Sequence, residues 1–254
     1  MRRIMLTVAY DGTAYHGWQR QPDKNSIEDR LDACLTQLLK EPVRVIGASR
    51  TDAGVHALGN IAVFDTEARM EAEKFSYALN QRLPEDIRIR ASREVPADFH
   101  PRKTDSVKTY EYHILNEEFP NPVERLYSYF CYVPLDADRM DQAARLLQGE
   151  HDFQSFCSAG AQVESTVRTI YSCAVRREGT RLVIRIRGNG FLYNMVRIIA
   201  GTLMETGRGK YPPERIRDIL EARDRRAAGP TAPAKGLVLV SYEFPVFSEK
   251  TVDT

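Results

Sequence analysis

The chain has 254 residues, of which 43% are hydrophobic and 28% charged, a balance that is typical of globular proteins and excludes disordered, collagen-like and coiled-coil classes. This length predicts one large domain or two modest ones. The net charge is only +1 and the isoelectric point about 7.7, too low for a domain that binds nucleic acid by bulk charge alone. No apolar stretch is long enough to span a membrane, so we expect a cytoplasmic protein that does not associate with membranes.

Apolar periodicity in the first part of the chain predicts strands and helices in the order βαββαβ. In the first expected helix, Leu31, Leu35 and Leu38 fall on one face, and Pro84 ends the second. Between two short strands lies a polar segment, SRTDAGVHALGN, at 49–60. The expected strands cover 3–10, 43–47, 61–65 and 86–92, and the expected helices cover 26–40 and 67–83.

The rest of the chain repeats this order with one additional helix. A strand at 106–115 comes first, and a Glu178-Gly179 turn joins the two long strands that follow later. The further expected strands cover 127–134, 166–177, 181–187 and 236–244, and the helices cover 136–148, 191–206 and 212–223. We expect residues 245–254 to form a tail outside the core.

This element order predicts an α+β fold with two ferredoxin-like (βαββαβ) halves, whose antiparallel sheets join and leave a central cleft. The predicted halves are residues 1–104 and residues 105–254. The four cysteines have no CxxC spacing, so we expect reduced side chains that pack in the core. The five histidines have no metal-ligand spacing, and the sequence therefore predicts no metal site.

The segment ASRTDAGVHA at 48–57 gathers Arg50, Asp52 and His56 between two apolar strands. A loop at paired strand ends is where a rigid sheet presents a functional carboxylate, and Gly54 lets the backbone turn sharply. Asp shortly before Gly is also ordinary turn chemistry. From the residues alone, a functional carboxylate and a structural turn are both open.

A second cluster, YDGTAYHGWQRQ at 10–21, interleaves aromatic residues with amides and arginine. This mixture suits single-stranded or looped RNA, on which aromatic side chains stack with unpaired bases. The alternative is a loop that Trp18 pins against the core. Arginine makes up 28 of the 36 basic residues, which favours phosphate contacts because its planar fork binds phosphate in two places.

A third segment, GNGFLYNMVRIIAGTL at 188–203, is a glycine-containing turn that leads into a helix. The glycines suit either a phosphate site or simply the exit from a hairpin. Arg197 lies in the apolar stripe of this helix, where a guanidinium requires an anionic partner. In the strand KTYEY, Tyr110 and Tyr112 point to one side, and core packing is the default interpretation for both.

Taken together, these segments resemble the tRNA pseudouridine synthase A family. The matching stretches run in family order from the first strand to the last, and RTDAGVHA and GNGFLYNMVR are the most specific of them. The others are YDGTAYHGWQRQ, NQRLPEDI, KTYEY, GEHDFQSF, VRTI and APAKGLVLV.

The resemblance implies an isomerase that converts uridine to pseudouridine in tRNA, in the anticodon stem and loop (positions 38 to 40), without a cofactor and as a homodimer with a central RNA-binding cleft. Asp52 takes the place of the catalytic aspartate, and Arg50 that of the residue contacting RNA near the extruded nucleotide. Tyr110 corresponds to the tyrosine stacked on the uracil, Arg197 to the basic partner of the aspartate, and Leu237 to the leucine lining the uracil pocket. The first half then carries Asp52 and Arg50, and the second half carries the other three residues.

Departures from the family pattern occur at Asn60, Pro101 and Lys108. Three mechanisms are open for Asp52: attack on C1′, attack on C6 of the uracil, or action as the base of a glycal route. One rival function is the same chemistry at another RNA site. A second is a non-catalytic RNA-binding or RNA-folding protein. A third is a metal-dependent hydrolase, whose ligands would be Asp11, His16, Asp52 and His56.

Overall fold

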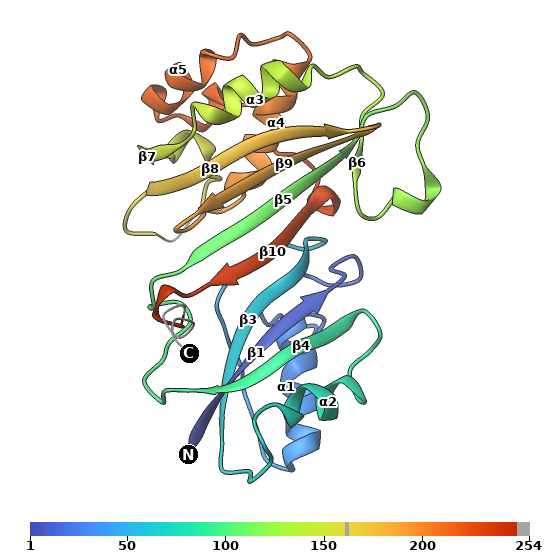
Figure 1. Cartoon of the computed structure of the whole chain (residues 1–254), viewed down its shortest axis with the longest axis vertical. Coiled ribbons are helices and arrows are strands. Elements are labelled where there is room, and N and C mark those ends of the chain that lie inside the picture. The colour runs from blue at the N-terminus through green and yellow to red at the C-terminus, as the bar shows by residue number, and fades with distance from the viewer. Residues whose placement is uncertain (161–162, 248–254) are drawn as a thin grey trace, which may run out of the picture. The chain divides into compact units, whose positions relative to one another are not determined.

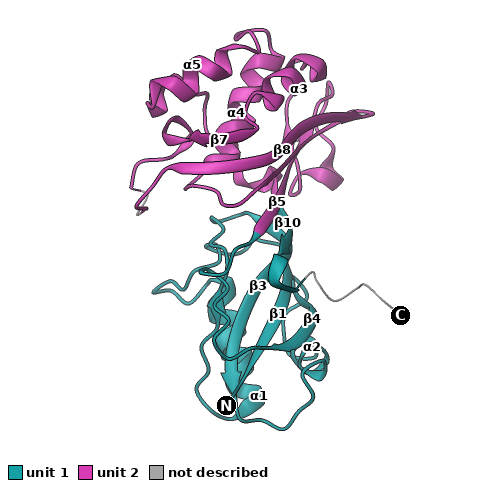
Figure 2. Cartoon of the chain, turned by 60° about the vertical axis from the view of Figure 1, so that its left-hand side comes forward, with its two compact units in different colours: residues 1–106, 239–254 teal, residues 107–238 magenta. Residues whose placement is uncertain are grey.

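The computed structural model describes residues 1–160 and 163–247. The chain divides into two compact units, shown in Figure 2. Unit 1 comprises Met1–Ser106 and the residues from Leu239 onward, and unit 2 comprises Val107–Val238. The sequence suggested a single division, after residue 104; the contacts divide the chain after residue 106 and again after residue 238. None of the helices in the described ranges is long and apolar enough to cross a membrane.

Unit 1 is built on an antiparallel sheet in which β1 pairs with both β3 and β4, and β2 adds a short pairing to β3 (Figure 1). The last strand, β10, lies beside β3. The elements are β1 (Arg2–Tyr10), α1 (Ile27–Leu39), β2 (Ile46–Gly47), β3 (His56–Thr66), α2 (Lys74–Asn80), β4 (Ile87–Val95) and β10 (Leu237–Glu243).

Both faces of the unit 1 sheet are apolar. Ile4 of β1 lies opposite Phe64 of β3, and the Phe64 ring meets Phe75 of α2 edge to face at 5.3 Å, so this face packs against the helices. Residues adjacent in a strand point to opposite faces. Met5 accordingly belongs to a second cluster on the other face, together with Ile61, Val63, Val95, Phe99 and Phe244.

Of the segment 245–247, Phe247 packs against this second cluster while Val246 is exposed, so the expectation of a tail outside the core is wrong for Phe247. These residues form a short 3-10 helix, Pro245–Phe247. The Phe247 ring lies 5.2 Å from the Phe99 ring and stacks under the guanidinium of Arg93 at 4.4 Å. The sequence pattern missed this because the contact partners are some 150 residues away along the chain. Residues 248–254 lie outside the described ranges.

Three element boundaries of unit 1 differ from the sequence prediction. Strand β3 begins at His56 rather than at residue 61, because β1 extends to Tyr10 and pairs there with Ala57. Helix α2 begins at Lys74 rather than at residue 67; the Met70 carbonyl before it accepts a hydrogen bond from Arg2, and the Lys74 N–H donates to the Glu71 carbonyl in a turn. Of the strand expected at 43–47, only Ile46–Gly47 is paired.

Unit 2 contains the strand order β5-β9-β8-β7, all antiparallel, and a short parallel pairing of β6 with β5. Helix α3 packs on β8 and on α4. The elements are β5 (Val107–Leu115), β6 (Tyr129–Phe130), α3 (Ala137–Arg145), β7 (Gly149–Asp152), β8 (Val167–Glu178), β9 (Arg181–Gly188), α4 (Met195–Gly207) and α5 (Arg215–Ala222).

Strand β7 was not expected from the sequence. Helix α3 ends at Arg145, before the predicted end at residue 148, and Gly149, at a φ of +104°, pairs with Ile170 of β8. Of the strand expected at 127–134, only Tyr129–Phe130 is paired, and the helix expected from residue 191 starts at Met195 because the preceding residues form a turn. Unit 2 is therefore a mixed α+β unit with a mostly antiparallel sheet, as unit 1 is.

Candidate active site

Asp52 lies in unit 1, on the loop between β2 and β3. Along this loop the side chains alternate: Ser49 and Thr51 are buried, Arg50 is exposed and Asp52 is partly exposed. The backbone then turns, with the N–H of Val55 donating to the Asp52 carbonyl at 3.1 Å and Gly54 at a φ of +76°. The structural turn that the motif predicted is therefore present, and Asp52 lies within it.

The aromatic side chains of the 10–21 cluster are buried, and the expectation that they stack on RNA is wrong. Trp18 is 1% exposed, and Tyr10 and Tyr15 are equally inaccessible. Trp18 pins the loop against the core, as the alternative interpretation held: a Cβ added to Gly47 would lie 2.0 Å from the indole nitrogen. Any contact of this loop with RNA would therefore use its polar side chains.

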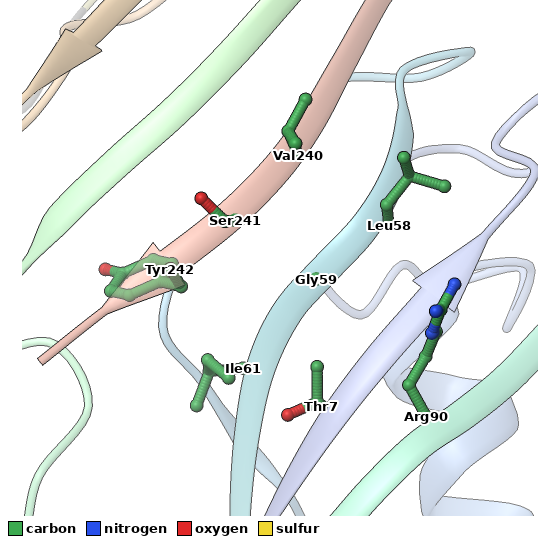
Figure 3. Close-up of a pocket in the computed structure, with 8 residues that line it drawn as sticks. All are labelled: Thr7, Leu58, Gly59, Ile61, Arg90, Val240, Ser241 and Tyr242. Atoms are coloured by element: carbon green, nitrogen blue, oxygen red, sulfur yellow. The ribbon is translucent and has the colours of Figure 1, made fainter. Parts of the chain in front are cut away.

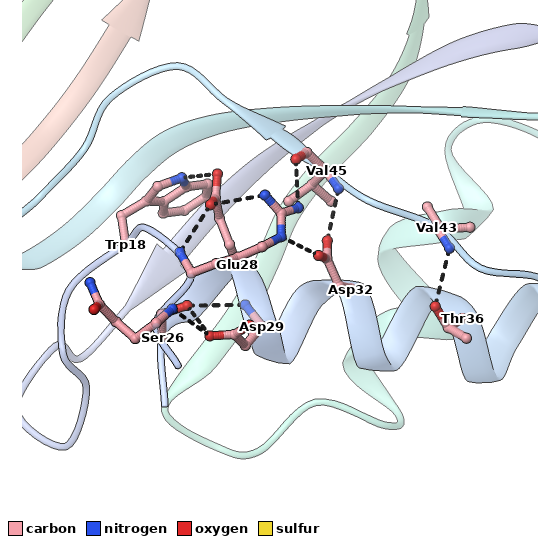
Figure 4. Close-up of polar contacts among 10 residues, drawn as sticks. Trp18, Ser26, Glu28, Asp29, Asp32, Thr36, Val43 and Val45 are labelled. Carbon is pink, nitrogen blue, oxygen red and sulfur yellow. Dashed lines mark hydrogen bonds and ion pairs between the residues drawn. The ribbon is translucent and has the colours of Figure 1, made fainter. Parts of the chain in front are cut away.

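Figure 4 shows the polar contacts that hold Trp18 in place. The indole N–H donates to Oε1 of Glu28 at 2.9 Å, and Glu28 is the buried carboxylate in the first turn of α1. The other oxygen of Glu28 accepts from the backbone N–H and a guanidinium N–H of Arg20, each at 3.2 Å. Arg20 also donates to Asp32 and to the Val45 carbonyl, which ties α1 to the start of β2.

His56 connects the two loops of unit 1. Its Nδ1 accepts the backbone N–H of Gly12 at 3.1 Å, and Oδ1 of Asp11 lies 3.1 Å from the same nitrogen. A Cβ at Gly12 would overlap the Val55 carbonyl at 2.0 Å, so this close approach requires glycine. Within the described part of the chain, no group of three or more His, Cys, Asp or Glu side chains could hold a metal ion.

Tyr110 lies in unit 2, on β5, and is 7% exposed. Its ring meets Phe191 edge to face at 5.2 Å, and Phe191 belongs to the turn before α4. Tyr112, two residues on, is fully buried and donates its hydroxyl to the Pro233 carbonyl at 2.9 Å. Burial raises the pKa of Tyr112, although the nearby charge of Arg197 opposes that rise.

Arg197 lies on α4, in which it is the one residue that is not fully buried, all thirteen being described. Its Nε donates to the Ala232 carbonyl at 2.7 Å and its Nη1 to Oδ1 of Asn194 at 2.7 Å. Helix α4 approaches the 229–232 segment so closely that a Cβ at Gly201 would lie 1.8 Å from the Pro230 carbonyl. This contact sets the position of the Arg197 guanidinium relative to that segment.

Leu237 follows the same segment at the start of β10 and is 6% exposed. A Cβ at Gly236 would meet the Tyr112 ring at 2.8 Å, so the chain just before Leu237 passes directly over β5. The structure thus places Tyr110, Arg197 and Leu237 on neighbouring segments of unit 2, and Arg50 and Asp52 on one loop of unit 1.

A pocket of about 360 Å³ lies in unit 1, away from the predicted site residues. It is lined by residues of four strands, including Thr7 on β1, Leu58 on β3, Arg90 on β4 and Tyr242 on β10 (Figure 3). Neither Arg50 nor Asp52 contributes to its lining.

Sequence reasoning missed the residues that support the Asp52 loop, chiefly Tyr10, Thr51 and Asn60. All three are buried, and their polar atoms bond to one another or to the loop backbone. Thr51 and Asn60 are polar residues in or beside a strand, and such a pattern does not distinguish a buried network from a solvated face.

Comparison with known proteins gives a consistent result. A family model described as tRNA pseudouridine synthase matches residues 6–102 and 143–245. The chain is 47% identical to tRNA pseudouridine synthase A of Brevibacillus brevis over 94% of this chain and 98% of that protein, and 47% identical to that of Acetivibrio thermocellus over 96% and 100%. It is 48% identical to that of Halalkalibacterium halodurans over 94% and 91%. Among solved structures, a chain of a Cbf5-Nop10-Gar1 complex has a TM-score of 0.32 at 14% identity and covers 93% of this chain and 47% of its own, too distant for any conclusion.

Proposed function

The chain belongs to the tRNA pseudouridine synthase family and is therefore an isomerase that forms pseudouridine in tRNA, and we propose that it acts in the anticodon stem and loop, at positions 38 to 40. One observation carries the proposed site: Asp52 is a partly exposed carboxylate on a loop whose neighbours Ser49 and Thr51 are buried. Such a loop presents a carboxylate to a substrate in a defined orientation.

Five residues carry the proposed chemistry. Asp52 is the catalytic residue, and Arg50 contacts the RNA near the extruded nucleotide. Tyr110 stacks on the extruded uracil, Leu237 lines the uracil pocket, and Arg197 stabilises the charge of the aspartate. The family's motifs support each assignment at its own position, and the burial of Tyr110 and Leu237 suits groups that pack against the flat face of a base.

The reaction breaks the bond between N1 of uracil and C1′, turns the base, and forms a bond between C5 and C1′. The C5 proton is lost and N1 gains a proton, so neither an oxidant nor an external energy source is required. Asp52 acts on C1′ as a nucleophile, on C6 as a nucleophile, or as the base of a glycal route. A guanidinium close to a carboxylate in an apolar pocket stabilises its charged form, which is the role we propose for Arg197.

The proposed assembly follows from the family. We propose two ferredoxin-like halves with joined antiparallel sheets and a central cleft that binds RNA. The functional protein is a homodimer in the bacterial cytoplasm, where tRNA is found. Light scattering on the purified protein should give a mass of two copies of the 28.9 kDa chain. A mass of one copy would contradict the proposed dimer but not the proposed activity.

The function is tested with the purified full chain and unmodified tRNA transcripts that carry uridine at positions 38, 39 and 40, without any added cofactor. Pseudouridine is mapped by carbodiimide adducts and primer extension. We expect product at these positions with wild type and none with Asp52→Asn, while tRNA affinity in a filter-binding assay stays near wild type. Asp105→Asn removes an exposed carboxylate elsewhere in unit 1 and should leave the rate unchanged.

Each other outcome contradicts a defined part of the proposal. Product at other uridines only would exclude the anticodon stem and loop. Full activity of Asp52→Asn would exclude Asp52 as the catalytic group. Product that forms only after addition of a cofactor would exclude the mechanism that uses the protein's own side chains.

A further inference from the structure

A buried network of hydrogen-bonded side chains supports the loop that carries Asp52. The hydroxyl of Tyr10, at the end of β1, lies 2.7 Å from Oγ1 of Thr51. The side-chain amide of Asn60, on β3, donates to the Tyr10 oxygen at 3.3 Å and to the Ser49 carbonyl at 3.1 Å. The two inward-pointing residues of the loop, Ser49 and Thr51, are therefore both fixed to the strands beneath them.

The phenol oxygen of Tyr10 takes part in two of these hydrogen bonds, and in its bond with Thr51 either hydroxyl can be the donor. Asn60 already donates to the phenol oxygen of Tyr10, so the single phenolic proton is available for Thr51. Complete burial raises the pKa of Tyr10, and the hydroxyl therefore stays protonated at any working pH. The bond between Tyr10 and Thr51 is thus a permanent neutral contact and not a titrating one.

Thr51 is held through its backbone as well. Its carbonyl accepts the backbone N–H of Trp18 at 3.0 Å, and Gly17 approaches so closely that a Cβ there would lie 2.5 Å from the same oxygen. Gly17 has a φ of +88°, which a larger residue rarely adopts. The residue immediately before Asp52 therefore has little freedom in either its side chain or its carbonyl.

We propose that Tyr10 is a positioning residue for pseudouridine formation, which holds Thr51 and thereby sets the orientation of the Asp52 carboxylate. The inference rests on the proposed role of Asp52. Tyr10 and Thr51 are both buried, so their contribution is to the rate of the chemical step and not to tRNA binding. A displacement of about 1 Å at a reacting group is enough to slow catalysis about 100-fold.

The test compares variants that remove one hydroxyl without changing shape. Tyr10→Phe and Thr51→Val each delete one end of the contact, and Thr51→Ser keeps the hydroxyl. We expect kcat to fall about 10-fold or more in Tyr10→Phe and Thr51→Val, with KM for tRNA within about a factor of two of wild type. Thr51→Ser should restore most of the rate, and the double variant should be no slower than the slower single one, because both substitutions remove the same bond.

Tyr15→Phe is the matched control. Tyr15 is also a buried tyrosine, on the loop that follows β1, and its hydroxyl donates to Asp86 at 2.7 Å. The Tyr15→Phe substitution should lower the melting temperature about as much as Tyr10→Phe does, while kcat stays at the wild-type value. This comparison separates positioning of Asp52 from general stability of the loop.

Three results would overturn the inference: an unchanged kcat in Tyr10→Phe, equal losses of kcat in Tyr10→Phe and Tyr15→Phe, or a loss that appears wholly in KM. Failure of the proposed function is a different result, because Asp52→Asn would then remain active or wild type would form no pseudouridine in tRNA. The experiment uses the full chain throughout.

Discussion

At the residue scale, Glu28 holds the Trp18 loop in place through several hydrogen bonds. It is 4% exposed and accepts hydrogen bonds from the Trp18 indole and from two groups of Arg20. Its place in the first turn of α1 is favourable, because the helix N-terminus carries a partial positive charge. A buried carboxylate with these partners is stabilising only as long as all of them are present.

Replacement of Glu28 by alanine should therefore destabilise unit 1. The change leaves the Trp18 N–H and part of the Arg20 guanidinium without their acceptor, at a cost of about 2 to 4 kcal/mol in the free energy of unfolding. Glu28→Gln keeps an oxygen for the indole and should cost less. Denaturant unfolding measures both against Glu41→Ala, an exposed control. A loss equal to that of the control would show that these contacts contribute nothing to stability.

At the element scale, the pairing of β1 with β3 is reinforced by an ion pair between directly opposite residues. Arg3 and Asp65 face each other in the register, with Nε and Nη2 of the arginine each 2.7 Å from a carboxylate oxygen. The third nitrogen of Arg3 donates to the Phe99 carbonyl at 2.7 Å, which ties the segment after β4 to the same site. Two parallel hydrogen bonds make this the stronger form of an arginine and carboxylate pair.

This pair predicts a defined pH dependence of stability. The hydrogen bonds from Arg3 hold the pKa of Asp65 below its usual value. A carboxyl whose pKa is lower in the folded state stabilises that state above the ordinary Asp pKa of about 3.9, and the contribution is lost as the pH falls further, through the folded pKa. The melting temperature of Asp65→Asn should therefore lie below that of wild type at neutral pH, and the two should converge below about pH 4.

Calorimetric scans at a series of pH values check this convergence. Asp105→Asn, an exposed control without a bidentate partner, should show no pH-dependent difference from wild type. A gap between Asp65→Asn and wild type that stays constant down to the lowest pH would contradict the ionic origin of the stabilisation.

At the scale of the whole molecule, the cysteine side chains are shielded from solvent. All four lie in the described ranges, and all are free thiols and buried. Burial raises the pKa of Cys173 to about 12, and also raises the pKa of Cys34 and of Cys157. Thiolate is the reactive form, so burial and a raised pKa both protect these side chains from reagents in solution.

Thiol titration of the native protein should thus be slow and depend on unfolding. We expect Ellman's reagent to label essentially no thiol quickly in the native state and all four in denaturant. Ala222→Cys places one exposed thiol at the end of α5 and should add a single fast equivalent. Rapid labelling of a native cysteine would show that its surroundings open far more readily than the structure implies.

The extent to which sequence predicted the site depends on how local each feature is. The motif at 48–57 correctly indicated a loop between two strands, because the apolar strands and Gly54 are adjacent in the chain. The role of Trp18 could not be decided, because an aromatic residue in a polar loop looks the same whether it faces solvent or the core. Only the contacts with Glu28 and Gly47 settle that it is buried.

The amino-acid sequence by itself determined the family, the α+β class, most strands and helices, and the positions of the proposed site residues, since these rest on local periodicity and on motifs of contiguous residues. The tertiary structure alone decided that the loop aromatics are supports, that β3 extends back to His56, and that Phe247 packs against the core. Each of these depends on partners that are distant in sequence and meet only when the chain folds. The buried hydrogen bonds that join Asn60, Tyr10 and Thr51 also depend on residues that are distant in sequence.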